Sequence, residues 1–224
     1  MFLKYINISN ILYIITMKIY TKNGDTGTTS LYDGTKVTKN NNIVQAVGDL
    51  DELNCEIGSI LAHFNSKKEI DSETKYYCLL NNIQSEIFDM GSILSNDPNS
   101  GNIEKKQMLF DKNNEFITKI ESYIDEMTNQ LPKLTKFILP GGNLFISSIH
   151  RARTICRRAE SKITSIKYDP IYFNQDTDEL SNDNINRCLA YINRLSDYLF
   201  TLARFTAMSL NIPEVYYQKT RIIE

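Results

Sequence analysis

Arginines are concentrated in one short segment of this chain, Ile149–Lys162, which reads IHRARTICRRAESK. If the segment is helical, Arg153, Arg157 and Glu160 share one face, because they are spaced at i, i+4 and i+7. The chain otherwise uses many lysines, and the rigid fork of a guanidinium suits phosphate or carboxylate better than an ammonium does. We therefore interpret this face as a candidate anion site. The alternative is a solvated face held by pairs such as Arg157 with Glu160.

A glycine-bearing segment near the N-terminus, Thr21–Ser30 (TKNGDTGTTS), is a second candidate for anion binding. Gly24 and Gly27 allow backbone N–H groups to converge on one ligand, and the hydroxyls and Lys22 add donors. The segment is not a Walker A loop, because G-x-x-x-x-G-K-[ST] is absent. Two other interpretations stay open: a plain surface turn, and the phosphate loop of sugar kinases with the actin-like fold, which Asp25–Ser30 resembles.

A third group of polar residues lies near the C-terminus. Asn193 and Asp197 are four residues apart and share a helix face, with Arg194 beside them and Arg204 seven residues beyond Asp197. This group fits either a binding site or hydrogen bonding between helices.

The elements that must position these residues are helical. Glycine (9) and proline (5) are scarce in 224 residues, which favours long helices. Apolar residues recur at three- and four-residue steps in five segments, at about residues 49–64, 76–94, 116–131, 145–163 and 189–206. The first is expected to begin at Asp49, with Asp49 and Glu52 as a capping box. The sequence therefore predicts an all-α five-helix bundle after an irregular arm over residues 18–48.

Composition excludes several classes of protein. A net charge of −2 argues against a dedicated nucleic-acid binder. The sequence contains no stretch of about 18 uncharged apolar residues, so we expect no membrane-spanning helix. The four cysteines and two histidines lack the close spacing of a zinc site, and we expect the cysteines to be reduced core residues.

The chain is expected to contain one domain, over residues 18–217. Residues 1–17 are expected to be a leader or disordered tail, and residues 218–224 a C-terminal tail.

Together these segments resemble the PduO-type cob(I)alamin adenosyltransferases. The matching blocks are Thr21–Ser30, Val47–Asn54 (VGDLDELN), Ile83–Gly91 (IQSEIFDMG), Phe137–Gly142 (FILPGG), Ala152–Glu160 (ARTICRRAE) and Tyr191–Phe205 (YINRLSDYLFTLARF). They span most of residues 18–217 in the order of the family. The resemblance implies a five-helix bundle assembled as a homotrimer. It also implies transfer of the 5′-deoxyadenosyl group of ATP to the cobalt of reduced cobalamin, Co(I), with release of triphosphate.

The resemblance also implies roles for individual residues. ATP is expected between subunits, with Mg²⁺ on its phosphates and no certain metal ligand from the protein. The expected ATP-binding residues are Thr21, Lys22, Asn23, Gly24, Thr29, Ser30, Lys39, Arg157, Arg158, Glu160, Ser161 and Asn193, although Ser161 stands where the family commonly has a further arginine. Arg153 is expected to pair with Asp51 of a neighbouring chain. Phe137 corresponds to the aromatic residue that displaces the lower ligand of cobalamin. The catalytic set is thus Arg157, Arg153, Asp51 and Phe137.

The chemistry fits this set of residues. Co(I) is itself a strong nucleophile, so the reaction needs no serine, cysteine or histidine activated by a base. It needs C5′ held in line with cobalt and neutralisation of the leaving triphosphate, which are tasks of positioning and electrostatics.

The alternatives to this function are an actin-like-fold small-molecule kinase and a non-enzymatic helical-bundle interaction protein. A cobalamin reductase or an adenosylcobalamin-dependent mutase are the expected protein partners, and the expected location is mitochondrial, with cytoplasmic as the alternative. The polar loop over residues 168–184 receives no role.

Overall fold

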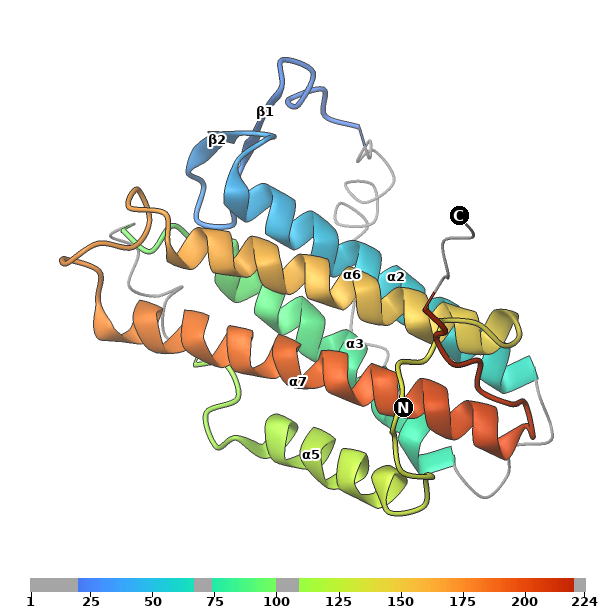
Figure 1. Cartoon of the computed structure of the whole chain (residues 1–224). Coiled ribbons are helices and arrows are strands. Elements are labelled where there is room, and N and C mark those ends of the chain that lie inside the picture. The colour runs from blue at the N-terminus through green and yellow to red at the C-terminus, as the bar shows by residue number, and fades with distance from the viewer. Residues whose placement is uncertain (1–19, 67–73, 100–108, 220–224) are drawn as a thin grey trace, which may run out of the picture.

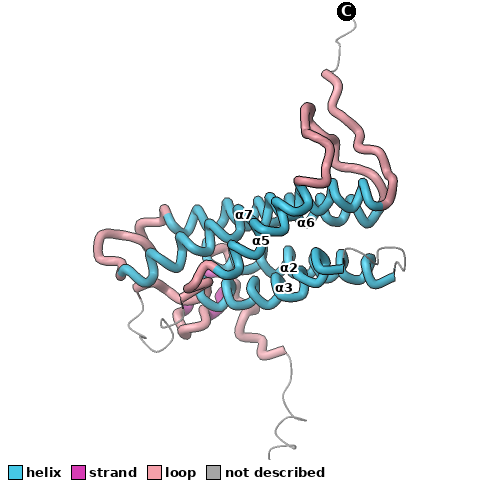
Figure 2. Tube along the Cα trace, turned by 90° about the horizontal axis from the view of Figure 1, so that it is seen from below, coloured by secondary structure: helices cyan, strands magenta, loops and turns pink. Residues whose placement is uncertain are grey.

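The computed structural model describes residues 20–66, 74–99 and 109–219, which form five helices and one two-stranded hairpin (Figure 1). The elements in chain order are β1 (Thr28–Ser30), β2 (Lys36–Thr38), α2 (Asn42–Ser66), α3 (Thr74–Leu94), α5 (Glu115–Thr128), α6 (Leu144–Lys167) and α7 (Glu179–Ser209). The helices run alongside one another in both views (Figures 1 and 2), so the predicted all-α five-helix bundle is confirmed. Among the described residues, no helix is long and apolar enough to cross a membrane. The leader assigned to residues 1–17 lies outside the described part of the chain.

Helix α7 is the central helix of the bundle. It packs against α6 and α5, while α6 also packs against α2, and α3 lies on α2. Two of its tyrosines, Tyr191 and Tyr198, are fully buried and donate hydrogen bonds to α3: the first to Glu86 Oε2 at 2.5 Å and the second to the backbone oxygen of Tyr76. Because buried hydroxyls are costly to leave without a partner, these bonds fix how α3 and α7 face each other.

The starts of α6 and α7 have local causes. Asn143 caps α6 by accepting a hydrogen bond from the Ile146 N–H at 2.9 Å, directly after Pro140, Gly141 and Gly142, which do not favour a helix. Asp178 caps α7 in the same way. The fifth helix therefore begins inside the segment predicted to be a polar loop, about ten residues before the first apolar position used to predict it.

The first helix also begins earlier than predicted. Helix α2 starts at Asn42, and Ile43 and Ala46 are buried, so the last residues assigned to the arm are helical. The Asn41 side chain accepts a hydrogen bond from the Ile43 N–H at 2.9 Å, which orients this end.

The capping box predicted at Asp49 and Glu52 is therefore wrong. Both residues lie inside α2, and both carboxylates pair with Arg158 on α6. A capping pair and an interhelical ion pair use the same residue types, so the sequence alone did not distinguish them.

The arm contains a short antiparallel hairpin that the sequence did not predict. β1 pairs with β2 in a register that places Thr29 opposite Val37. In the turn between the two strands, the Tyr32 N–H donates to Ser95 O at 2.9 Å, and Asp33 Oδ2 accepts from the Asp97 N–H at 3.0 Å. The arm is thereby anchored at the C-terminal end of α3.

All four cysteines are free. Cys156 and Cys188 are buried, as predicted, but Cys55 and Cys78 are exposed on α2 and α3, so the core prediction is wrong for these two.

The loop that follows α6 holds the start of α2. The buried Tyr172 hydroxyl accepts a hydrogen bond from Asn41 Nδ2, and Asp169 Oδ2 accepts one from Asn42 Nδ2 at 2.9 Å. The loop left without a role by the sequence therefore braces the junction between the arm and α2.

This brace predicts a stability effect. Tyr172→Phe removes the hydroxyl partner of Asn41 and is expected to destabilise the fold by about 1 kcal/mol, which lowers the unfolding temperature of a domain of this size by roughly 2–4 °C. Thermal unfolding monitored by circular dichroism measures this. Tyr168→Phe is the matched control, because Tyr168 is exposed. Equal melting of the two variants would contradict the brace.

A second two-stranded pairing lies at the opposite end of the bundle. Ile138 and Tyr216 form an antiparallel bridge, flanked by hydrogen bonds from Leu139 N–H to Val215 O and from Tyr217 N–H to Phe137 O, both 2.8 Å. We call residues 137–139 and 215–217 the ribbon. The loops of this end and the β1/β2 hairpin lie at opposite ends of the helices (Figures 1 and 2).

Candidate active site

One side of α6 combines two arginines with a carboxylate held by α7. Arg153, Arg157 and Glu160 follow one another along this side, and Asn193 Nδ2 donates to Glu160 Oε1 at 2.9 Å. The structure thus brings Glu160 and Asn193 together, as required of a common site. It does not support the pairing of Arg157 with Glu160 that a solvated face would use.

The two arginines of this side lack partners within the described residues. Arg153 Nε is buried without a hydrogen-bond acceptor. Burial lowers the pKa of the Arg153 guanidinium, and the nearby positive charge of Arg157 lowers it further. Arg157 is exposed and forms no ion pair within the described chain. A buried guanidinium N–H without an acceptor is unfavourable, so this side of α6 is suited to an anionic ligand or a carboxylate from another chain.

The other two arginines of the cluster face α2. Arg158 Nε donates to Asp49 Oδ1 at 3.1 Å, and its Nη2 pairs with Glu52. Arg151 Nη2 donates to Glu56 Oε2 at 2.5 Å. The four-arginine cluster therefore divides into two pairs on different sides of α6, because adjacent helical residues point about 100° apart. Arg158 is not brought together with Arg157, Glu160 and Asn193.

The arm brings its lysine and glycines together. The Lys39 N–H donates to Gly27 O at 2.9 Å, and the Lys39 side chain folds back over Gly24. A Cβ on Gly24 would lie 2.9 Å from Lys39 Nζ, so glycine is what allows this approach. Lys22 and Gly27 both have positive φ, at 62° and 79°. This curled backbone leaves its polar side chains exposed, as expected of a loop that wraps an anion.

The remaining predicted residues lie on surfaces. Thr21 and Asn23 are exposed in the arm, Thr29 and Ser30 belong to β1, and Ser161 is exposed on α6. On α2, Asp51 is exposed. Phe137 is 83% exposed at the ribbon, which is unusual for a phenylalanine and shows that its ring does not pack in the core of this chain.

One chain separates these groups along the bundle. The arm with β1 and β2 lies at one end of the helices, the loop over residues 129–143, which contains Phe137, lies at the other end, and α6 spans the distance between them (Figures 1 and 2). Helix α6 alone has 24 residues and is about 36 Å long. A ligand that contacts both the arm and Phe137 must therefore take them from different chains.

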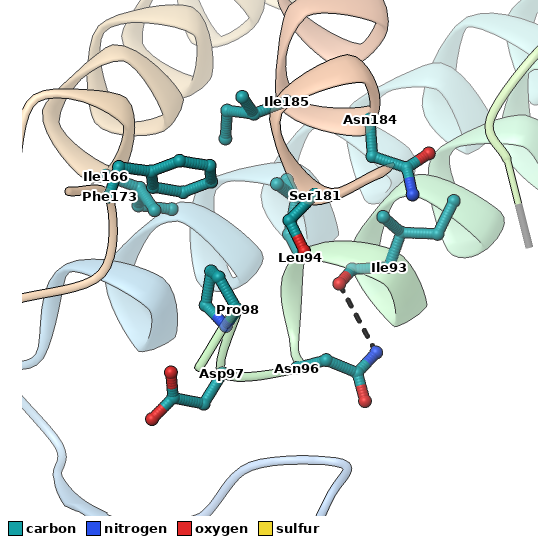
Figure 3. Close-up of a pocket in the computed structure, with 10 residues that line it drawn as sticks. All are labelled: Ile93, Leu94, Asn96, Asp97, Pro98, Ile166, Phe173, Ser181, Asn184 and Ile185. Atoms are coloured by element: carbon teal, nitrogen blue, oxygen red, sulfur yellow. Dashed lines mark hydrogen bonds between the residues drawn. The ribbon is translucent and has the colours of Figure 1, made fainter. Parts of the chain in front are cut away.

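The pocket in Figure 3 is not large enough for such a ligand. It lies between the end of α3, the end of α6 and the start of α7, and is lined mainly by apolar side chains such as Ile93, Phe173 and Ile185. Its volume is about 50 Å³, and the Asn96 amide at its edge donates to Ile93 O at 3.3 Å. This pocket has room for water or a small group but not for a nucleotide.

Comparison with known proteins agrees across sequence and structure. Residues 19–206 match the family model described as cobalamin adenosyltransferase. The chain is 37% identical over 203 residues to the corrinoid adenosyltransferase MMAB of Bos taurus, covering 90% of this chain and 76% of that protein. It is 35% identical over 208 residues to the corrinoid adenosyltransferase of Bacillus subtilis (strain 168), covering 92% of this chain and 95% of that protein.

Solved structures resemble the fold as well. A phenylalanine-to-alanine variant of the PduO-type ATP:corrinoid adenosyltransferase of Lactobacillus reuteri, complexed with cobalamin and ATP, superposes with a TM-score of 0.74 at 32% identity, covering 90% of this chain and all of that one. An arginine-to-lysine variant of that enzyme complexed with ATP gives a TM-score of 0.71 at 33% identity, covering 89% of this chain and all of that one.

Proposed function

Because this chain belongs to the cobalamin adenosyltransferase family, we propose that it binds ATP and a corrinoid. We propose that the two react at the side of α6 that carries Arg157 and Glu160, next to Asn193 of α7. The chain is an enzyme, an ATP:corrinoid adenosyltransferase, which transfers the 5′-deoxyadenosyl group of ATP to cobalt. The observation that carries the assignment of the site is the pair Arg153 and Arg157 beside the Asn193–Glu160 hydrogen bond. The kinase alternative is wrong, because the described residues form helices and a small hairpin rather than an α/β core.

The reaction asks little covalent chemistry of the protein. The Co(I) electron pair forms a bond to C5′ of ATP, and the C5′–O bond breaks, so triphosphate departs with its electron pair. Arg157 is proposed to stabilise the negative charge that grows on this leaving group. Glu160, oriented by Asn193, accepts a hydrogen bond from a donor group of the nucleoside.

The arm is proposed to wrap the phosphates. Its backbone and hydroxyl donors come from Thr21, Asn23, Gly24, Thr29 and Ser30, and its charges come from Lys22 and Lys39. The closeness of Lys39 to Gly24 supports this, since both then reach one phosphate group. Ser161 lies one residue beyond Glu160 at the edge of the same site. For Arg158 we now propose a different task, joining α2 to α6 through Asp49 and Glu52.

Each site is proposed to lie between two subunits of a homotrimer. The arm and Phe137 are at opposite ends of one chain, so the head-to-tail contact that unites them repeats until the assembly closes into a ring. Asp51 of one subunit is proposed to pair with Arg153 of the next. The exposed carboxylate and the unpartnered guanidinium support this pairing.

Magnesium is proposed to bind through the substrate. Within the described ranges, no three histidine, cysteine or acidic side chains form a metal site. The ATP phosphates would then supply most of the ligands to Mg²⁺, which prefers oxygen. The proposed partners are a cobalamin reductase and an adenosylcobalamin-dependent mutase, and the proposed location is mitochondrial, with cytoplasmic as the alternative.

The proposed function is tested by incubating the protein with chemically reduced cobalamin and Mg·ATP. The expected result is the absorbance change of alkylcobalamin formation together with one intact triphosphate per product. Release of ADP, or no ATP-dependent change in the corrinoid spectrum, would contradict it. Size-exclusion chromatography with light scattering tests the trimer in the same preparation.

Substitution at Gly24 tests the arm. In Gly24→Ala the new Cβ lies 2.9 Å from the Lys39 amine, so the end of this flexible side chain must shift. Part of its contact with the phosphate is expected to be lost, and the KM for ATP is expected to rise by roughly three- to tenfold, with an unchanged unfolding temperature. Gly48→Ala is the matched control, because a Cβ there meets nothing within 4 Å. An unchanged KM would remove Lys39 from the site.

A further inference from the structure

The segment that carries Phe137 has no helical support of its own. Residues 129–143 connect α5 to α6, and Phe137 lies within them with its ring 83% exposed. A ring that must displace a metal ligand by occupying its space needs a fixed position, because a mobile ring would yield to the ligand. The question is therefore what holds this segment in place.

The C-terminal segment supplies one part of the answer. In the ribbon, Phe137 O accepts from the Tyr217 N–H and Leu139 N–H donates to Val215 O, both at 2.8 Å. These bonds lie on either side of Ile138 and hold the backbone from Phe137 to Leu139 in an extended form. Because side chains alternate along a strand, Phe137 and Leu139 point to the same face of the ribbon.

A buried ion pair supplies the other part. Arg204, on α7, is 8% exposed, and its Nε donates to Glu214 Oε1 at 2.7 Å. Its Nη2 donates to Pro132 O at 2.9 Å. The guanidinium of Arg204 therefore binds the start of the segment that carries Phe137, through Pro132, and the start of the C-terminal segment, through Glu214. The planar fork of arginine allows both contacts at once, whereas a lysine does not.

Among the residues that the structure describes, Glu214 forms its ion pair with Arg204 and with no other cation. His150 lies beside it, buried, and burial lowers the pKa of its imidazole, with Arg153 lowering it further and Glu214 opposing the shift. Burial and Arg153 therefore both favour the neutral form of the ring. Glu214 also accepts a hydrogen bond from the Tyr216 hydroxyl at 3.2 Å, within the ribbon itself. The carboxylate is thus shared between the bundle and the ribbon.

We propose that Arg204 and Glu214 are positioning residues that hold the ribbon against α7 and so fix Phe137 where it excludes the lower ligand of the corrinoid. This inference rests on the proposed function, in which Phe137 contacts the corrinoid. It adds the C-terminal segment, beyond the helices, to the parts of the chain that control cobalt coordination. The ion pair itself does not touch the reacting atoms.

Two test variants, Glu214→Ala and Tyr217→Pro, separate positioning from folding, and three further variants serve as rescue and controls. Glu214→Ala removes the ion pair, and Glu214→Gln restores an oxygen acceptor for Arg204. Tyr217→Pro removes the N–H that binds Phe137 O while leaving the buried pair intact. Gln218→Pro places the same ring one residue later and keeps the Tyr217 N–H. Asp183→Ala, which breaks the Arg187–Asp183 pair on the same helix α7, is the control for loss of an ion pair.

The main readout is the fraction of four-coordinate cob(II)alamin in the presence of ATP, from absorption and EPR spectra. Tyr217→Pro is expected to lower the ratio of four- to five-coordinate cobalt by roughly three- to tenfold, the factor that loss of one hydrogen bond gives. Glu214→Ala is expected to lower it at least as much, and Glu214→Gln to recover part of the loss. The KM for ATP should not change, and Gln218→Pro and Asp183→Ala should match the wild type.

Amide hydrogen exchange gives a readout that does not depend on activity. The Leu139 amide is expected to exchange faster in Glu214→Ala and Tyr217→Pro than in the wild type. Wild-type coordination spectra in a folded Glu214→Ala, or in Tyr217→Pro if Glu214→Ala does not fold, would overturn the inference and leave the proposed function in place. Failure of the wild type to adenosylate Co(I) would overturn both.

Discussion

In the Arg157→Ala variant, kcat for adenosylation is expected to fall by about 100- to 1,000-fold, the loss typical of removing one donor that stabilises developing negative charge. The guanidinium is exposed, and within the described residues it forms no ion pair, so its removal should hardly change the unfolding temperature. The measurement is the conversion of reduced cobalamin at saturating ATP, together with thermal unfolding.

The neighbouring arginines make the test specific. Arg151→Ala also removes a guanidinium from α6, but one that pairs with Glu56 on the α2 side. It should lower stability and leave kcat unchanged, because a buried carboxylate loses its partner. Arg157→Lys keeps the charge without the fork and should fall between the wild type and alanine. Wild-type kcat and KM for ATP in Arg157→Ala would remove this residue from the site.

In the Phe137→Ala variant, the expected result depends on the oxidation state supplied. Starting from cob(II)alamin and a reductant, turnover should fall at least about tenfold, equivalent to about 1.4 kcal/mol of barrier, because the lower ligand stays on cobalt and hinders its reduction. Starting from preformed Co(I), which has no lower ligand to displace, turnover should approach the wild-type rate. The affinity for ATP should not change, since the arm is untouched.

The control for this variant is another exposed apolar residue. Ile171 is 72% exposed in the loop after α6, away from the ribbon, so Ile171→Ala should match the wild type from either oxidation state. An equal loss from Co(II) and Co(I) in Phe137→Ala would assign the ring a general role in binding rather than in ligand displacement. Wild-type spectra with cob(II)alamin would refute the steric role.

The helices could be predicted from sequence where local signals coincide. For α6, an apolar period of three and four residues follows Pro140-Gly141-Gly142, and Asn143 provides the cap, so pattern and boundary agree. For α2 they disagree. The three asparagines before Ile43 suggest a loop, but two of them bind Tyr172 and Asp169, more than 120 residues away. Tertiary contacts of this kind leave no local pattern.

The candidate site could be predicted only in part for the same reason. The spacing of Arg157 and Glu160 on one side of α6 followed from helical geometry. Asn193 was singled out by its spacing from Asp197, and the family resemblance added its role in binding ATP. That Arg158 turns to α2 could also have been derived, since residues 157 and 158 point in different directions. The Arg204–Glu214 pair could not, because the sequence shows nothing that folds residue 214 back onto α7 next to Pro132.

Placing the arm and Phe137 at opposite ends of the bundle has a genetic consequence. In the proposed head-to-tail trimer, a subunit damaged in its arm still offers an intact Phe137 ring to one neighbour, and a subunit lacking the ring still offers an intact arm to the other. Two alleles that are each inactive alone can therefore complement each other when co-expressed, whereas two alleles damaged at the same end cannot.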